Sequence, residues 1–164
     1  AAIAITAYMM NPEHDVNRPS KVIVTNRSVP RLEEMQCIHK KLGFSVPCEY
    51  HHCPNAEDND QVVDKLPPYS VVINATGLGK DRPGSPLTDS ALFPRHGIAW
   101  DFNYRGDLRF LGQARAQSGE RNIVVEDGWT YFVFGWALVI AEVFHIRIDS
   151  AKVEELGQIA AQLR

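Results

Sequence analysis

Short runs of β-branched residues alternate with segments of helical spacing along most of this chain, and this alternation constrains the fold more than any other feature. The predicted strands are 21–25, 45–51, 70–76, 97–104 and 122–127, and the predicted helices are 1–10, 31–42, 58–66, 108–118, 128–144 and 150–163. Strands separated by helices of about ten residues need crossover connections, which place the strands parallel and cover both faces of the sheet. We therefore predict a doubly wound, parallel α/β fold.

Glycine and proline mark several element ends. Gly43 and Gly119 each follow a run of helical spacing and are predicted to end a helix, because glycine readily adopts the left-handed conformation that closes one. Pro47 restricts its strand to a sheet edge or a strand start. Residues 91–94 are expected to form a short helical turn at most.

Composition limits the function classes. The chain has 164 residues, 45% of them hydrophobic, and a net charge of −3, which suits one soluble domain and argues against nucleic-acid binding. Three cysteines without a disulfide-framework spacing indicate a reducing compartment, so we expect a cytoplasmic protein. The most apolar run, 129–144, is shorter than the roughly 20 residues that span a bilayer, and no membrane association is expected.

The chain opens with "AAIAITAYMM", which has helical composition but no capping residue in front of it. In a dinucleotide-binding fold, a Gly-rich turn after the first strand holds the pyrophosphate, and about 20 residues later the second strand ends in the group that binds the ribose. Counting back from Asn26, with allowance for the insertion-like "NPEHDVNRP", places that turn just before Ala1. We therefore expect this chain to lack the first strand and the Gly-rich loop.

The predicted strand 21–25 runs into Asn26, Arg27 and Ser28, with Arg31 shortly after. An acid at this point would accept hydrogen bonds from the adenosine 2′-hydroxyl and repel a 2′-phosphate. Two guanidinium groups and a hydroxyl instead suit a phosphate dianion, because arginine offers planar, bidentate donors. The sequence therefore favours NADP over NAD, the alternative being a solvated turn that happens to contain arginine.

Four motifs stand in order at predicted strand ends: "VTNRSVPR", "VVINATGLG", "DFNYRGDLRFL" and "VEDGW". Together they resemble the cofactor domain of the shikimate/quinate dehydrogenase family. The resemblance covers nearly the whole chain and implies one Rossmann-like NADP-binding domain over 1–164. It also implies a place in aromatic amino acid biosynthesis. The expected partners are a small hydroxy-acid substrate and either a second copy of the chain or an N-terminal substrate domain, toward which helices 128–144 and 150–163 would pack.

The resemblance also implies roles for individual residues. Tyr104, three residues after Asp101, and Tyr131 would lie beside the nicotinamide and the substrate. Asp127 and Gly128 would present backbone to the nicotinamide carboxamide, although Asp127 alone could also be a helix cap. The residues implied in 2′-phosphate binding are Asn26, Arg27, Ser28 and Arg31, and those implied along the dinucleotide are Asn74, Ala75, Thr76, Gly77 and Leu78.

Several positions depart from the family pattern. Gly135 stands where the family places a glutamine that touches a substrate hydroxyl, and Tyr131 and Lys80 each replace a usual methionine. Nothing in the chain matches the family's catalytic Lys–Asp pair, so we assign no catalytic residue here. The resemblance implies hydride transfer between NADP(H) and a ring hydroxyl or ketone of a cyclohexane-type hydroxy acid. A non-catalytic dinucleotide-binding module, or a related dehydrogenase such as methylene-tetrahydrofolate dehydrogenase or glutamyl-tRNA reductase, remains an alternative.

Two further groups of residues invite a function. Cys48, His51, His52 and Cys53 are potential metal ligands, but neighbouring strand residues point to opposite faces and cannot converge tetrahedrally, so no metal site is predicted. His51 or His52 could instead border the adenine end of the cofactor. A second group is the apolar stripe of the helix 128–144, which we expect to be core or interface; its members are Trp129, Phe132, Trp136, Ile140 and Val143.

Overall fold

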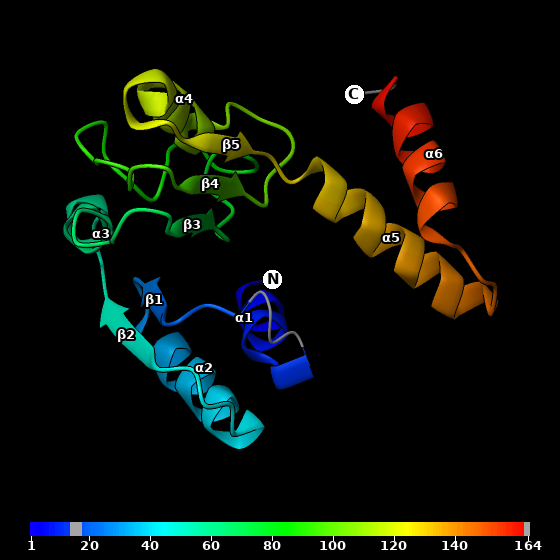
Figure 1. Ribbon diagram of the computed structural model, residues 1–164, viewed down its shortest axis with the longest axis horizontal. Helices are drawn as coiled ribbons and strands as arrows, with labels where there is room; N and C mark the ends of the chain where they lie inside the picture. Colours follow the sequence, from blue (N-terminus) through cyan, green and yellow to red (C-terminus); the bar gives the residue numbers. More distant parts are fainter. Residues whose placement is uncertain (14–17, 163–164) are drawn as a thin grey trace. The chain divides into compact units, whose positions relative to one another are not determined.

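The computed structural model describes residues 1–13 and 18–162, which fall into two compact units (Figure 1). The first unit comprises Ala1–Leu66 and Pro86–Leu92, and the second comprises Pro67–Ser85 and Phe93–Arg164. Residues 14–17 of the expected insertion and residue 163 of the last predicted helix lie outside the described residues. No helix in the described part of the chain is both long enough and apolar enough to cross a lipid bilayer.

The first unit contains a two-stranded parallel sheet with helices packed against it. Register pairs Val22 with Cys48 and Asn26 with His52, so the two strands end side by side. The elements in chain order are α1 (Ala2–Met10), β1 (Val22–Asn26), α2 (Val29–Leu42), β2 (Cys48–His52) and α3 (Ala56–Val63).

The core of the first unit lies between β1 and α2. Val24, Leu32 and Met35 are buried there, and Ala2 and Tyr50 pack against them. One polar side chain joins this core: His39 is 6% exposed and bonds through its two ring nitrogens to Thr6 Oγ1 (2.8 Å) and to Tyr50 Oη (2.6 Å). The buried histidine is therefore satisfied on both sides, and burial lowers its pKa.

The second unit contains a three-stranded parallel sheet of order β3-β4-β5. Register pairs Val71 with Ile98 and Asn74 with Asp101, so the carboxyl ends of the first two strands are level. The elements in chain order are β3 (Val71–Asn74), β4 (Ile98–Asp101), α4 (Arg109–Arg121), β5 (Val124–Glu126), α5 (Trp129–Phe144) and α6 (Ser150–Ala161).

Helix α4 packs on β4 and β5 of this sheet. The rings of Phe93 and of Phe110, which belongs to α4, meet edge to face with their centroids 5.4 Å apart. Each is at most 1% exposed, and burying such a ring contributes about 1.5–3 kcal/mol. Helices α5 and α6 pack on one another, and Gly157 lets α6 approach Val133 closely. Most of the predicted stripe on α5 stays open in this chain, with Trp136 55% exposed and Val143 66% exposed.

The structure confirms the parallel α/β architecture and every predicted strand and helix, with shifts at their ends. Helix α2 starts two residues earlier than predicted, because Pro30 is tolerated in a first turn, where its missing N–H has no helical partner. Gly43 ends this helix in the left-handed conformation, as predicted. The end predicted at Gly119 is wrong: α4 continues to Arg121, and Asn122 adopts the left-handed conformation instead. Residues 91–94 form no helical turn.

Candidate functional site

The carboxyl ends of four strands share one local geometry, in which an Asn or Asp side chain turns the chain out of the sheet. In each, an Oδ1 atom accepts a hydrogen bond from the backbone N–H two residues later, which is an Asx turn. The four pairs, with their O···N distances, are Asn26–Ser28 (2.9 Å), Asn74–Thr76 (3.0 Å), Asp101–Asn103 (2.9 Å) and Asp127–Trp129 (2.9 Å). These turns place the predicted site residues beyond the strand ends.

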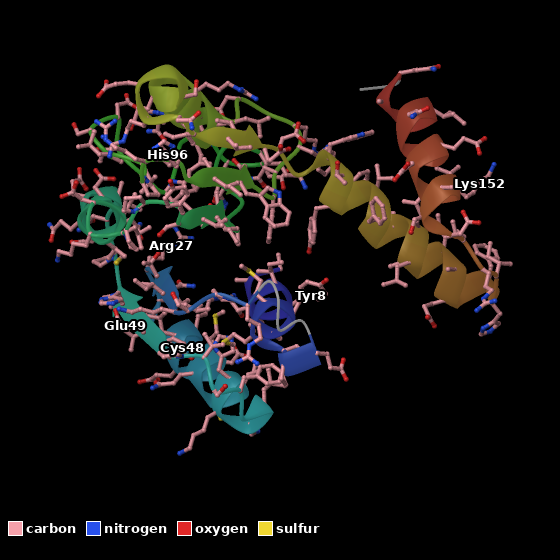
Figure 2. All side chains as sticks on the ribbon, in the orientation of Figure 1. Tyr8, Arg27, Cys48, Glu49, His96 and Lys152 are labelled. Carbon is pink, nitrogen blue, oxygen red and sulfur yellow. The ribbon has the colours of Figure 1, made fainter. Side chains whose placement is uncertain are left out.

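At the end of β1, the turn makes Ser28 the N-cap residue of α2, yet its side chain makes no capping hydrogen bond. Arg27 lies at this strand end, labelled in Figure 2, and Arg31 lies in the first helical turn; both side chains are exposed. Within the described residues, neither guanidinium forms an ion pair.

The first turn of α2 contains no acidic residue. A cation at the positive end of a helix dipole is unfavourable by itself, and a bound anion would offset that cost. Two cationic groups, a hydroxyl and the helix N-terminus therefore form an arrangement that fits a phosphate group. Asn26, Arg27 and Ser28 thus lie on the turn after β1, which Asn26 shapes, and Arg31 lies in the first turn of the helix that follows.

In the second unit, three polar side chains form a buried network between the ends of β3 and β4. Asn74 and Asp101 are at most 1% exposed and Asn103 is 5% exposed. Asn74 Nδ2 donates to Asp101 Oδ2 (3.1 Å), and Asn103 Nδ2 donates to the carbonyls of Thr76 (3.1 Å) and Leu78 (3.0 Å). A further hydrogen bond runs from Thr76 Oγ1 to Asn74 Oδ1 (2.7 Å). The network fixes the loop that follows β3.

The loop itself is more accessible than the network below it. Thr76 and Gly77 are exposed, and Ala75 and Leu78 are half-buried. Asn74 was predicted to touch a dinucleotide, but its side chain is occupied by protein groups, so we expect it to act by holding the loop in place. Asn103 was not predicted as a site residue; the only signal for it in the sequence is a second Asx-type residue two positions after Asp101.

Asp101 is the one acid in this network. Burial raises its pKa, since a desolvated carboxylate is disfavoured, while the backbone N–H of Asn103 and the amide of Asn74 partly oppose the rise. The charge of Asp127 adds to it. The oxygens of Asp101 accept hydrogen bonds from the Asn74 side chain and the Asn103 backbone N–H, and these two residues hold the loop after β3. Asp101 therefore helps to keep that loop in position.

Tyr104 and Tyr131 join two neighbouring aromatic groups beyond the end of β4. Tyr104 stacks on Phe132, with centroids 4.2 Å apart, and meets Trp129 at 5.9 Å. Tyr131 stacks on Phe102 at 4.6 Å and remains 40% exposed. Both predicted substrate-side tyrosines therefore lie near the start of α5.

Asp127 and Gly128 connect β5 to α5. The Gly128 N–H donates to the carbonyl of Asn103 (3.0 Å), and the Asp127 carbonyl accepts from Trp100 Nε1 (3.3 Å). A Cβ on Gly128 would stand 2.1 Å from the Phe102 carbonyl oxygen, so only glycine allows the chain to pass here. The start of α5 is thus held against the loop after β4.

The cysteine and histidine side chains of β2 and the residue after it point to different partners, not to a common centre. Cys48 Sγ donates to Met10 Sδ (3.2 Å), His51 Nε2 lies 3.2 Å from Glu49 Oε2, and His52 Nε2 donates to the Arg27 carbonyl (3.2 Å). Among the described residues, no three His, Cys, Asp or Glu side chains could share a metal ion. The three cysteines of the chain are free.

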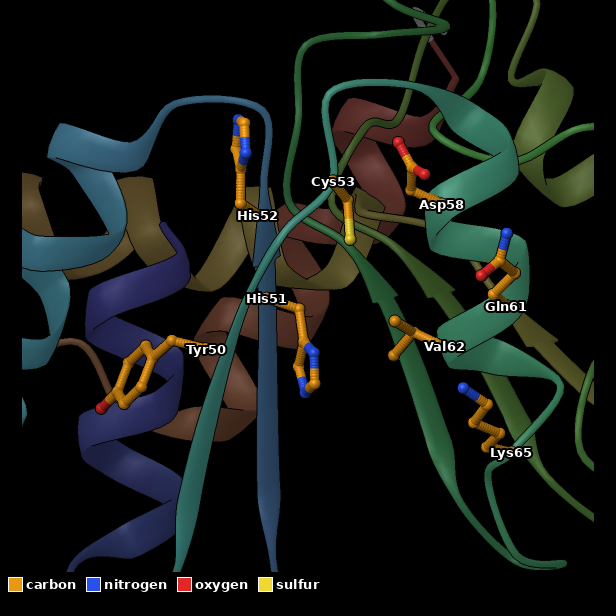
Figure 3. Close-up of a pocket in the computed structure, with 8 residues that line it drawn as sticks. All are labelled: Tyr50, His51, His52, Cys53, Asp58, Gln61, Val62 and Lys65. Carbon is orange, nitrogen blue, oxygen red and sulfur yellow. The ribbon is translucent and has the colours of Figure 1, made fainter.

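A pocket of about 310 Å³ lies between β2 and α3 (Figure 3). His51 projects into it, whereas Tyr50 points to the other side of the strand. The lining residues are Tyr50, His51, His52, Cys53, Asp58, Gln61, Val62 and Lys65. The predicted place of His51 or His52 beside adenine stays a prediction.

No protein-family model matches the sequence, and no curated protein matches it. Among solved structures, the chain is similar to a chorismate mutase/shikimate 5-dehydrogenase fusion protein from Clostridium acetobutylicum, with a TM-score of 0.58 and 20% sequence identity. The similarity covers 90% of this chain and 47% of that protein, so this chain spans about half its length. At this identity the comparison establishes the fold. The chain therefore has a Rossmann-like α/β fold of the shikimate dehydrogenase type, as its sequence motifs predicted.

Proposed function

We propose that the chain is the NADP(H)-binding part of an oxidoreductase similar to shikimate/quinate dehydrogenases. The observation that carries this proposal is the turn after β1, where Arg27 and Arg31 are exposed and, in the described part of the chain, without ion-pair partners. A guanidinium pair held by an Asx turn at a helix N-terminus is suited to the 2′-phosphate of NADP and has no comparable use for the 2′-hydroxyl of NAD.

The remaining predicted residues would serve the rest of the cofactor. The loop after β3, which is exposed at Thr76 and Gly77 and half-buried at Ala75, would lie along the dinucleotide. Tyr104 and Tyr131 would flank the nicotinamide and the substrate ring, and Gly128 would present backbone to the carboxamide. When bound, NADP(H) supplies the hydride; this chain binds and orients it.

We propose a cyclohexane-type hydroxy acid as the substrate and the cytoplasm as the compartment, the latter on the basis of the free cysteines. No residue here matches the family's catalytic Lys–Asp pair. The groups that move the hydroxyl proton are therefore proposed to come from a substrate domain outside these 164 residues.

Equilibrium titration of the purified protein with NADPH and NADH tests the cofactor assignment. We expect tighter binding of NADPH, and Arg27→Ala should weaken NADPH binding about tenfold to a hundredfold, since it removes charge-assisted hydrogen bonds, while leaving NADH unchanged. Arg115→Ala, at another exposed arginine, on α4, is the matched control and should change neither affinity. Equal affinities for the two cofactors in the unmodified protein would refute the proposed phosphate site.

A non-catalytic dinucleotide-binding module is the second candidate, favoured by one observation. Gly135 occupies the position where the family has a substrate-binding glutamine, so this position offers no side chain to a substrate hydroxyl. Packing does not require the glycine, since a Cβ there would meet no atom within 4 Å. NADP⁺ binding without turnover of shikimate or quinate, by a preparation that includes any substrate domain, would support this candidate over the enzyme.

A further inference from the structure

The ammonium group of Lys80 lies over the ring of Tyr104, with Nζ 4.8 Å from the ring centroid. Both side chains are half-buried. Tyr104 is in turn stacked on Phe132, so the lysine charge stands at the border of an aromatic surface next to the start of α5. Cation–π contact holds an ammonium group in place without neutralising its charge.

The backbone of Lys80 is held by close packing between the loops that follow β3 and β4. A Cβ on Gly106 would stand 2.3 Å from the Gly79 carbonyl oxygen and 2.9 Å from Lys80 Cα. The Gly79 carbonyl also accepts a hydrogen bond from the Leu108 N–H (3.1 Å). An ion pair between Arg105 and Asp81 (3.1 Å) joins the same loops. This packing therefore fixes the backbone of Lys80, and the contact with Tyr104 holds its ammonium group.

Positive charge is concentrated on these two loops. Residues 80–84 and 105–109, the last of which is the first residue of α4, carry four cationic side chains and two carboxylates, although the whole chain has a net charge of −3. Of the two carboxylates, Asp81 pairs with Arg105. Among the described residues, Lys80 itself has no ion-pair partner, so its charge is available to an anion.

We infer that Lys80 recognises the carboxylate of a ring-bearing acid whose ring lies beside the stacked pair of Tyr104 and Phe132. The inference rests on the proposed function in taking this acid to be the substrate. Aromatic rings beside the ammonium group of Lys80, which the Tyr104 ring holds in place, suit a hydrocarbon ring that carries a carboxylate better than they suit a hydrated phosphate. Lys80 is thus a specificity-determining residue at a position where the resembling family has methionine.

Titration of the full chain with shikimate and with its uncharged methyl ester tests this inference, in the presence of saturating NADPH. Lys80→Met should weaken shikimate binding about tenfold and leave the ester unaffected, while Lys80→Arg should retain most of the preference for the acid. Lys152→Met on α6 removes the same charge from a lysine paired with Glu155 and serves as the control.

The outcomes separate the inference from the proposed function. A carboxylate preference that persists in Lys80→Met, with normal NADPH binding, overturns the role of Lys80 and leaves the cofactor assignment intact. A loss of NADPH affinity in Lys80→Met also overturns it, because the charge would then serve the cofactor. If the unmodified protein fails to bind NADPH, the cofactor proposal falls, whereas an acid preference measured without NADPH and abolished in Lys80→Met still supports carboxylate recognition.

Discussion

Replacing Gly128 by alanine should destabilise the second unit strongly. The added Cβ would stand 2.1 Å from the carbonyl oxygen and 2.4 Å from the carbonyl carbon of Phe102, well inside van der Waals contact. Both atoms belong to backbone that is fixed on either side, because the Phe102 N–H donates to Asn74 and the Gly128 N–H donates to the Asn103 carbonyl. Relief requires a shift of the start of α5, and we expect a cost of about 3 kcal/mol or more, the upper end for overpacking.

Gly135→Ala is the matched control, since it makes the same substitution inside α5, the helix that Gly128 precedes, at a position where a Cβ meets no atom within 4 Å. Alanine is favoured over glycine in a helix interior, so this variant should be stabilised by roughly 1 kcal/mol. All three tryptophans lie in the second unit, so tryptophan fluorescence during urea denaturation follows that unit. If both substitutions changed the free energy of unfolding in the same direction, the packing argument would be refuted.

The pH dependence of stability gives two further predictions. Burial raises the pKa of Asp101 above its ordinary 3.8, so its contribution to the free energy of unfolding should fall as the pH rises from 3.8 through the raised value. Fluorescence-monitored urea unfolding should show this loss in the unmodified protein but not in Asp101→Asn; parallel profiles would contradict it. Burial lowers the pKa of His39 below its ordinary 6.5, so the first unit should lose stability as the pH falls below 6.5 through the lowered value. Amide hydrogen exchange in α2 at pH 7 and pH 5 measures this loss, and His39→Gln should abolish it.

The order and type of the elements could be predicted from sequence because the periodicities are strong. β-branched runs such as "VIVT" and "SVVI" and the heptad-like spacing of α2 each favour one structure. Helix ends were less predictable, as Gly119 illustrates. Glycine in a helix interior costs about 1 kcal/mol, and packing of α4 on β4 and β5 outweighs that cost, so the helix continues past Gly119 to Arg121.

Buried partners could not be predicted at all. Asn103 reaches the carbonyls of Thr76 and Leu78 from a different strand end, a contact that depends on the register of β3 against β4. Nor does periodicity indicate that Lys80 would lie on Tyr104, since the two loops are joined by the packing of Gly106 against Gly79. Both depend on contacts between segments distant in sequence.

The four Asx turns also bear on what the motif resemblance can prove. Asn26, Asn74, Asp101 and Asp127 are all among the residues that carry it, and in this structure each accepts a hydrogen bond from the N–H two positions on. Any chain that must leave four parallel strands sharply would favour such residues, whatever it binds. The resemblance at these positions therefore supports the fold more than the ligand. Specific support for NADP has to come from side chains with no such structural task, which is why Arg27 and Arg31 carry the functional proposal.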